Sequence, residues 1–220
     1  MRTKSISIFM LFIAATLVCT GHAQTTSAAF KKVPELAAIK LSSYSLKVVQ
    51  YILKHAKSED ISIIGDKSNS MMYVFKGNSL IAANPFLHGI SRADEFPGGS
   101  QKAAYSMAIP TAKKMVSPSG KFLLTKTMND PDYGTSLTFA IYKDWRIAIH
   151  QVYSGAPEQQ RQQRLESATD KDNTITSGCL NVDKDFYFEI LDKLVITSNS
   201  FLYVIPNNVS LMDKFLPLID

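Results

Sequence analysis

One stretch of this sequence decides the expected fold and chemistry: Ile175-Thr176-Ser177-Gly178-Cys179-Leu180-Asn181-Val182. It contains one of the two cysteines in 220 residues, the other being Cys19. Cys19 lies in a predicted signal peptide, so Cys179 would be the single cysteine of the mature chain. A lone cysteine in an exported protein cannot form an internal disulfide, and it is therefore either an inert buried thiol or a nucleophile.

The first 23 residues are typical of a secretory signal peptide. Two basic residues open the chain, residues 6–18 are mostly apolar, and Gly21-His22-Ala23 offers small residues at the positions that a signal peptidase reads. Cleavage would leave Gln24 as the N-terminus of a periplasmic or secreted protein. The apolar run is shorter than the roughly 20 residues of a membrane span, so no span is expected after cleavage. Lipid modification of Cys19 is the alternative, but Val18 stands where that processing needs a small residue.

The remaining length and composition indicate one ordinary domain. About 197 residues remain after cleavage, which is enough for a full hydrophobic core. The formal net charge of +5 is too small and too evenly spread to indicate a nucleic-acid partner. One cysteine and three histidines in the mature chain, without paired spacing, do not indicate a metal site, and the sequence contains no cofactor motif. We therefore expect neither a metal nor a cofactor.

The first half of the chain reads as a helix followed by strands. Apolar residues at helical spacing predict an amphipathic helix from Pro34 to about His55. Short apolar runs predict a strand and a hairpin at residues 61–64, 71–75 and 80–83. The segment 85–120 contains Pro and Gly turn markers and is expected to be rich in loops.

The second half returns to strand-like runs, at residues 121–127, 137–142, 146–152 and 201–205. The segment Ser154 to Thr174 is polar and has no apolar face, so it is expected to be a long loop. Asp183 is expected to cap a helix that runs to about Lys193. The chain is therefore predicted to be mainly β, with helices at its edges.

The residues around Cys179 favour the nucleophile. A cysteine nucleophile needs a base, a stiff turn to aim it, and backbone N–H groups for the developing oxyanion. Gly178 permits a tight backbone, and the N–H groups of Gly178 and Cys179 are candidates for the oxyanion hole. His150 ends a strand-like run and precedes the polar segment, where catalytic residues are often found.

Other interpretations of these residues stay open on composition alone. A single cysteine is often a small buried hydrophobic residue, and a histidine at a strand end is often structural. His55 and His88 are further candidates for the base, although His55 falls in the predicted first helix and His88 in an irregular stretch.

The spacing of His150 and Ser177-Gly178-Cys179-Leu180-Asn181-Val182 resembles the catalytic signature of the YkuD family of L,D-transpeptidases. In that family a histidine closes a strand and a Ser/Thr-His-Gly-Cys motif follows. The run Pro118-Ser119-Gly120-Lys121-Phe122 resembles the family's Pro-x-Gly-x-Phe segment, and Tyr73-Val74-Phe75 resembles its opening strands. The resemblance covers about Ile61 to Val195. It implies a YkuD-like β-sandwich over residues 58–220, after the signal peptide (1–23) and an N-terminal tail and helix (24–57).

The resemblance also implies roles for particular residues. Cys179 would be the nucleophile and His150 the base, while Ser177, Asn181 and Arg164 would face the substrate. The chain departs from the common pattern at Ser177, where many members have a second histidine, and at Asn181, where many have arginine. The stretch between His150 and Cys179 is also longer than in compact members, and its arginines could pair with stem-peptide carboxylates.

By this resemblance the protein would be an extracytoplasmic cysteine acyltransferase that acts on peptidoglycan stem peptides, in cell-wall biogenesis and cell shape. An amine acceptor, on another stem or on a wall-anchored protein, would give a cross-link. A water acceptor would make the protein an L,D-carboxypeptidase or a hydrolase of cross-links. A non-catalytic envelope-binding module with the same fold is the alternative from a different class.

Overall fold

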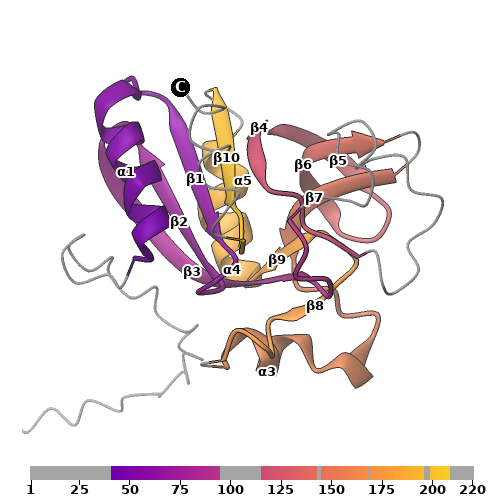
Figure 1. Cartoon of the computed structure of the whole chain (residues 1–220). Coiled ribbons are helices and arrows are strands. Elements are labelled where there is room, and N and C mark those ends of the chain that lie inside the picture. Colours follow the sequence, from indigo (N-terminus) through magenta and orange to yellow (C-terminus); the bar gives the residue numbers. More distant parts are fainter. Residues whose placement is uncertain (1–40, 95–114, 143–144, 168, 196–198, 209–220) are drawn as a thin grey trace, which may run out of the picture. The chain divides into compact units, whose positions relative to one another are not determined.

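The computed structural model describes residues 41–94, 115–142, 145–167, 169–195 and 199–208 (Figure 1). Their strands are β1 Ile61–Asp66, β2 Met71–Lys76, β3 Ser79–Gly89, β4 Gly120–Leu123, β5 Thr125–Asp130, β6 Gly134–Tyr142, β7 Trp145–Gln151, β8 Thr174–Thr176, β9 Leu180–Val182 and β10 Ser200–Ile205. Their helices are α1 Ser43–His55, η3 Pro157–Gln159, α3 Arg161–Leu165, α4 Lys184–Phe186, η4 Tyr187–Leu191 and α5 Asp192–Leu194.

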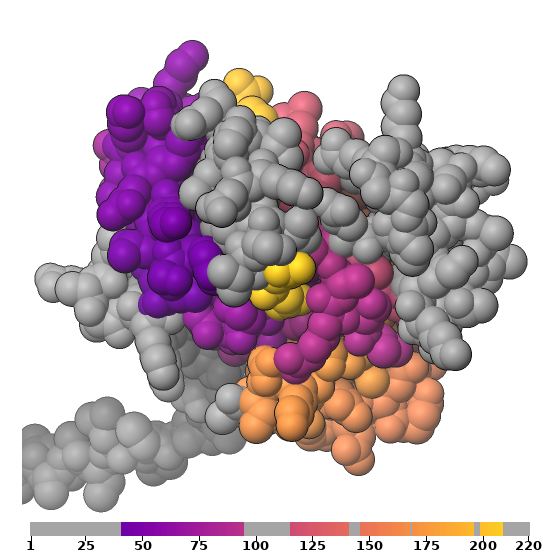
Figure 2. Space-filling view, viewed as in Figure 1, coloured from indigo at the N-terminus to yellow at the C-terminus, as the bar shows by residue number. Residues whose placement is uncertain are grey.

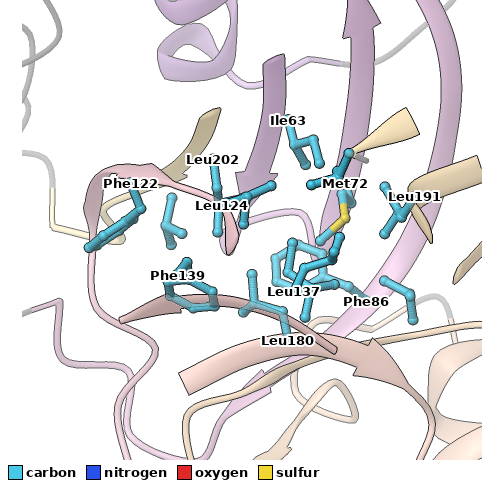
Figure 3. Close-up of a cluster of buried hydrophobic side chains, with 14 of the residues drawn as sticks. Ile63, Met72, Phe86, Phe122, Leu124, Leu137, Phe139, Leu180, Leu191 and Leu202 are labelled. Atoms are coloured by element: carbon cyan, nitrogen blue, oxygen red, sulfur yellow. The ribbon is translucent and has the colours of Figure 1, made fainter. Parts of the chain in front are cut away.

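The strands form one sheet in the order β4-β10-β1-β2-β3-β9-β7-β6-β5, and β8 pairs with β3 outside this path. The sheet folds over so that its two halves pack face to face around one hydrophobic core. Ile63, Met72 and Leu202 from one half share this core with Leu137 and Leu180 from the other (Figure 3). The architecture is therefore mainly β and sandwich-like, with peripheral helices, as the sequence predicts.

A second, smaller core explains why β1 is buried along its whole length. Helix α1 lies over β1 and β2 (Figure 1). Its Val48, Val49 and Ile52 form a cluster of buried residues with Ile64 of β1 and Tyr203 of β10. Because β1 has the main core on one face and α1 on the other, all six of its residues are buried, including the polar Ser62 and Asp66.

Helix α1 begins later than the sequence predicts. Leu41 and Ser42 are not helical, and Ser42 has an extended backbone and accepts a hydrogen bond from the Ser45 N–H at 3.1 Å. A side-chain oxygen at this position satisfies one of the unpaired donors of the first turn, so the helix starts at Ser43. A single helix from Pro34 to His55 is therefore wrong at its start, and residues 34–40 lie outside the described part, as does the predicted signal peptide.

Two strands differ in extent from the prediction. β3 runs through Pro85 to Gly89, although a proline cannot donate to a strand ladder. Pro85 lies at the point where the partner of β3 changes from β2 to β9, so its missing N–H breaks neither ladder. The expected strand 121–127 is two strands divided at Leu124, because β4 pairs with β10 and β5 pairs with β6.

The polar segment 154–174 is not a plain loop. It contains η3 and α3, and in the space-filling view the α3 segment lies against the end of β3 (Figure 2). Leu165 of α3 is 2% exposed, and Arg161 and Arg164 of the same helix form hydrogen bonds to neighbouring segments. The expectation of a structureless loop is therefore wrong.

The C-terminal elements agree with the prediction. Asp183 accepts hydrogen bonds from the N–H groups of Asp185 and Phe186, and the helical run α4, η4 and α5 continues to Leu194. β10 then follows as the last described strand. In the described ranges we find no helix with both the length and the apolar character needed to cross a membrane.

Candidate active site

Cys179 lies in a tight turn between β8 and β9. Gly178 has φ of +123°, and a Cβ atom there would approach the Val116 carbonyl oxygen to 2.7 Å, so the position requires glycine. The Thr176 hydroxyl donates to the Cys179 carbonyl at 2.6 Å and accepts from the Gly178 N–H at 3.1 Å. The Ser117 hydroxyl donates to the Gly178 carbonyl at 2.7 Å. These contacts fix the backbone that carries the thiol.

The buried ion pair of Lys67 and Asp94 is connected to this turn through Ser117. Lys67 and Asp94 lie 2.7 Å apart with both side chains almost fully buried. The Lys67 ammonium also donates to the Ser117 carbonyl at 2.9 Å, and the Gly89 N–H donates to the Ser117 hydroxyl at 2.9 Å. The segment that carries the Pro-Ser-Gly motif is thereby joined to the turn around Cys179.

His150 lies on the strand next to the turn. β7 and β9 run parallel, with Ile149 opposite Leu180 and His150 opposite Asn181. Cys179 directly precedes β9, so the pairing brings the predicted base and nucleophile to neighbouring strands although they are distant in sequence.

A chain of hydrogen bonds fixes the form of the His150 imidazole. Its Nδ1 lies 2.6 Å from the Gln151 carbonyl oxygen, its Nε2 lies 3.0 Å from the Asn181 amide nitrogen, and Arg161 Nη1 donates to Asn181 Oδ1 at 2.6 Å. A carbonyl only accepts and a guanidinium only donates, so Nδ1 carries the proton and Nε2 accepts from the amide. Among the described residues, neither ring nitrogen bonds to the Cys179 thiol.

Two tyrosines complete the cluster. The Tyr133 ring stacks on the His150 imidazole at 3.5 Å between centroids and 13° between planes. Tyr153 meets Tyr133 edge to face at 5.8 Å, and the Arg161 guanidinium lies 5.7 Å from the Tyr153 centroid. Both tyrosines went unrecognised in the sequence because neither belongs to a motif. Tyr133 lies in the turn between β5 and β6. This turn comes close to His150 of β7 only in the folded sheet.

The protonation states of the two central groups follow from their burial. The pKa of His150 is lowered to about 4, mainly by burial and in smaller part by the Arg161 charge, against the opposing effects of the Gln151 carbonyl and Asp130. Burial raises the pKa of the Cys179 thiol, and a backbone hydrogen bond with Ala148 and the nearby Arg161 oppose that shift. At neutral pH the thiol is therefore protonated and the imidazole is neutral. This arrangement suits proton transfer during attack and does not hold a preformed thiolate–imidazolium pair.

The other predicted site residues have different environments. Asn181 is fully buried and bonds to His150, and Ser177 is half-buried beside the glycine of the turn. The Gly178 N–H, a predicted oxyanion donor, already donates to Thr176. Arg164 donates to the carbonyl oxygens of Gln159 and Asp172, so it holds the polar segment together, and Arg161 is the arginine that reaches the cluster.

The two alternative histidines lie elsewhere. His55 is an exposed residue at the end of α1, with its ring tilted against Tyr51, and His88 is buried at the end of β3, where its Nε2 lies 3.3 Å from the Ser70 hydroxyl. Within the ranges that the structure describes, no three His, Cys, Asp or Glu side chains are close enough together to hold a metal ion.

Comparisons with known proteins give structures but no sequence relatives. No family model and no curated protein matches the chain. The chain is similar to the helical cell shape determining protein Pgp2 from Campylobacter jejuni, with 14% identity and a TM-score of 0.41, over 67% of this chain and 48% of that one. Other solved structures that it resembles are L,D-transpeptidases. One, from Xylanimonas cellulosilytica, has 10% identity and a TM-score of 0.37 over 68% of this chain and 62% of its own.

The chain is also similar to the catalytic domain of the E. faecium L,D-transpeptidase, with 16% identity and a TM-score of 0.37. The match covers 67% of this chain and 98% of that domain. The chain spans less than two thirds of the Pgp2 and Xylanimonas chains. The Xylanimonas and E. faecium structures are L,D-transpeptidases, the family that the sequence resemblance named. At such identities and TM-scores the chemistry of the chain has to be argued from its own site.

The two buried histidines predict a loss of stability in mild acid. His88 and His150 both have pKa values lowered to about 4, with burial as the main cause, against 6.5 in an unfolded chain. The unfolded state therefore takes up protons first as the pH falls from 6.5 to 4. Each histidine should cost roughly 3 kcal/mol of unfolding free energy over this range, and the stability should be fully present above pH 6.5.

Urea unfolding at a series of pH values between 7.5 and 4 measures this effect. His88→Gln should flatten the profile, whereas the matched change His55→Gln on exposed α1 should leave it as in the wild type. An unfolding free energy independent of pH in this window would show that these histidines are not held neutral by the fold.

Proposed function

We propose that the protein is an extracytoplasmic cysteine acyltransferase of the L,D-transpeptidase type that acts on peptidoglycan stem peptides. The observation that carries the proposal is the imidazole of His150, held neutral with Nδ1 protonated, on the strand beside the rigid turn of Cys179. A neutral imidazole with Nδ1 protonated can act as a general base through the lone pair of Nε2, which accepts from the Asn181 amide in this structure.

The reaction begins with attack of the Cys179 sulfur on the carbonyl of the third stem residue. His150 Nε2 takes the thiol proton, a C–S bond forms, and the C–N bond to the terminal D-alanine breaks. The imidazolium returns the proton to the leaving amine, which leaves a thioester on Cys179. An acceptor amine or water then attacks the thioester, again through His150. Because Asn181 occupies Nε2 in this structure, its amide has to move before the base can act.

The surroundings of the site suit this chemistry. Tyr133 and Tyr153 present aromatic surface beside the imidazole, and Arg161 places a positive charge near the thiol. The Cys179 backbone N–H is the remaining candidate for the oxyanion donor, since Gly178 uses its own N–H inside the turn. The proposed location outside the cytoplasm follows from the signal sequence, with Gln24 as the mature N-terminus. A wall-anchored protein is a possible amine acceptor in addition to another stem peptide.

A second candidate, a non-catalytic binding module, is favoured by one observation. The thiol is protonated at neutral pH and the Nε2 atom of His150 is occupied by Asn181, as would suit a site that holds a peptide without turning it over.

Incubation of the purified protein with tetrapeptide muropeptides distinguishes these candidates. We expect mass spectrometry to show loss of D-alanine together with muropeptide dimers or, when D-amino acids are added, exchanged termini. Tripeptide alone, or split cross-links, would make the protein a hydrolase with the same Cys179 and His150. Bound but unchanged tetrapeptide would contradict the enzyme and support the binding module.

A further inference from the structure

Arg161 is a half-buried cation held by neutral groups. Its Nε donates to the Gln159 side-chain oxygen at 2.7 Å and its Nη1 donates to Asn181 Oδ1 at 2.6 Å. Within the described part of the chain, Arg161 forms no ion pair at 4 Å or less, although Glu158 acts on its charge from further away. Burial lowers the pKa of Arg161, which shows that its charge is partly desolvated. A desolvated guanidinium without a paired carboxylate is well suited to receive one from a ligand.

The contact with Asn181 connects this cation to the base. The hydrogen-bond chain runs from the guanidinium through the Asn181 amide to His150 Nε2, and from Nδ1 to the Gln151 carbonyl. The direction of every bond in this chain is fixed, because the Arg161 guanidinium at one end only donates and the Gln151 carbonyl at the other end only accepts. Arg161 therefore sets the orientation of the amide, and the amide presents its NH2 group to Nε2.

This orientation opposes protonation of the base. An imidazolium has an N–H at Nε2, which would face the NH2 group of Asn181 and leave two donors opposed. Turning the amide over would satisfy the imidazolium, but it would then place the NH2 group against the Arg161 guanidinium. His150 can accept a proton only after the contact between Arg161 and Asn181 is broken.

The charges around His150 come from several elements. Arg161 acts from α3 and lowers its pKa, and Asp130 acts from the end of β5 and raises it. Tyr133 stacks on the ring and has its own pKa raised to about 12 by burial, so it is neutral, as is the Cys179 thiol. Asp130 bonds to the Ser136 hydroxyl at 3.0 Å and not to the imidazole, so Arg161 is the charged residue connected to it by hydrogen bonds.

We propose that Arg161 is a positioning residue that holds Asn181 against His150 until a carboxylate of the donor peptide binds the guanidinium. This proposal rests on the proposed function. The substrate feature that Arg161 would recognise is a free carboxylate near the scissile bond. Binding of that carboxylate withdraws Nη1 from Asn181, and the amide is then free to leave Nε2. The base becomes able to accept a proton only when a suitable peptide is present.

The titration of the His150 imidazole tests the contact directly. NMR of the imidazole resonances should be followed against pH in a Cys179→Ala background, which cannot turn over. We expect Arg161→Met to raise the His150 midpoint by one pH unit or more, and the charge-matched change Lys193→Met, at an exposed position of α5, to leave it unchanged. Equal midpoints in the two variants would overturn the proposal. The same spectra show whether each variant is folded.

A double-mutant cycle separates this path from a simple charge effect. In an Asn181→Leu background, Arg161→Met should shift the midpoint by much less than it does when Asn181 is present. An undiminished shift would mean that Arg161 acts through space and would overturn the role of Asn181.

A peptide titration tests the ligand class. A tetrapeptide with a free C-terminal carboxylate should raise the His150 midpoint in the Cys179→Ala protein, and its C-terminal amide should not. If the tetrapeptide and its C-terminal amide shifted the His150 midpoint equally, the proposal that Arg161 binds a carboxylate would be wrong. None of these measurements requires turnover, so they can fail while Cys179 still forms a thioester, and the proposed function can fail while they succeed.

Discussion

Replacement of Cys179 by alanine should abolish D-alanine release from tetrapeptide muropeptides. The thiol is the only group in the described cluster that can form the covalent intermediate, and its backbone is fixed by contacts that do not involve the sulfur. Removing one atom should therefore leave the fold intact while the reaction stops. Release of D-alanine, measured by chromatography, should fall to the background without enzyme.

Cys179→Ser refines the same experiment. A hydroxyl is far harder to ionise than a thiol, so the serine variant should retain a trace of activity at most. Muropeptide turnover at the wild-type rate in the alanine variant would remove the mechanistic basis of the proposed function, because the reaction would then not pass through a thioester on Cys179.

Replacement of His150 by alanine should slow acylation of Cys179 by about 10²-fold or more. The thiol has a raised pKa and is protonated at neutral pH, so attack without a base has to proceed from a small thiolate fraction. The rate can be measured with a carbapenem as the acylating agent in stopped-flow absorbance. Because the pKa of His150 is about 4, the wild-type rate should decline only as the pH falls toward 4.

His55→Ala is the control for this prediction, since His55 is an exposed residue at the end of α1. It should acylate at the wild-type rate, whereas His88→Ala should act only through the stability of the fold. A His150→Ala rate within a factor of about three of the wild type, well below what a general base contributes, would assign the base to another residue.

The sequence indicates the core strands and the two central residues because each has a local cause. β1 is recognisable from the three isoleucines at residues 61–64, which pack into the cores on its two faces. The Asp183 cap is visible from its spacing to the helix that follows. His150 and Cys179 are found by their order and neighbours. They come to neighbouring strands through the parallel pairing of β7 and β9, which joins residues 31 positions apart.

The rest of the site depends on contacts that no local pattern records. Arg161 and Arg164 lie three residues apart in the same short helix, and the sequence gives no reason to prefer either. The fold turns Arg161 toward Asn181 and ties Arg164 to carbonyl oxygens of its own segment. Tyr133 reaches His150 only because the β5–β6 turn lies over β7. The polar segment is partly helical, and Leu165 is the buried residue of its helix α3. One apolar residue does not form an apolar face that the sequence pattern can reveal.

Intact mass spectrometry after incubation with a carbapenem tests the central claim most directly. The account predicts that the purified protein gains the mass of one carbapenem, that peptide mapping locates the adduct at Cys179, and that the Cys179→Ala protein gains nothing. An unmodified wild-type protein after prolonged incubation with excess carbapenem, in a sample shown to be folded, would contradict the assignment of Cys179 as a nucleophile activated by His150.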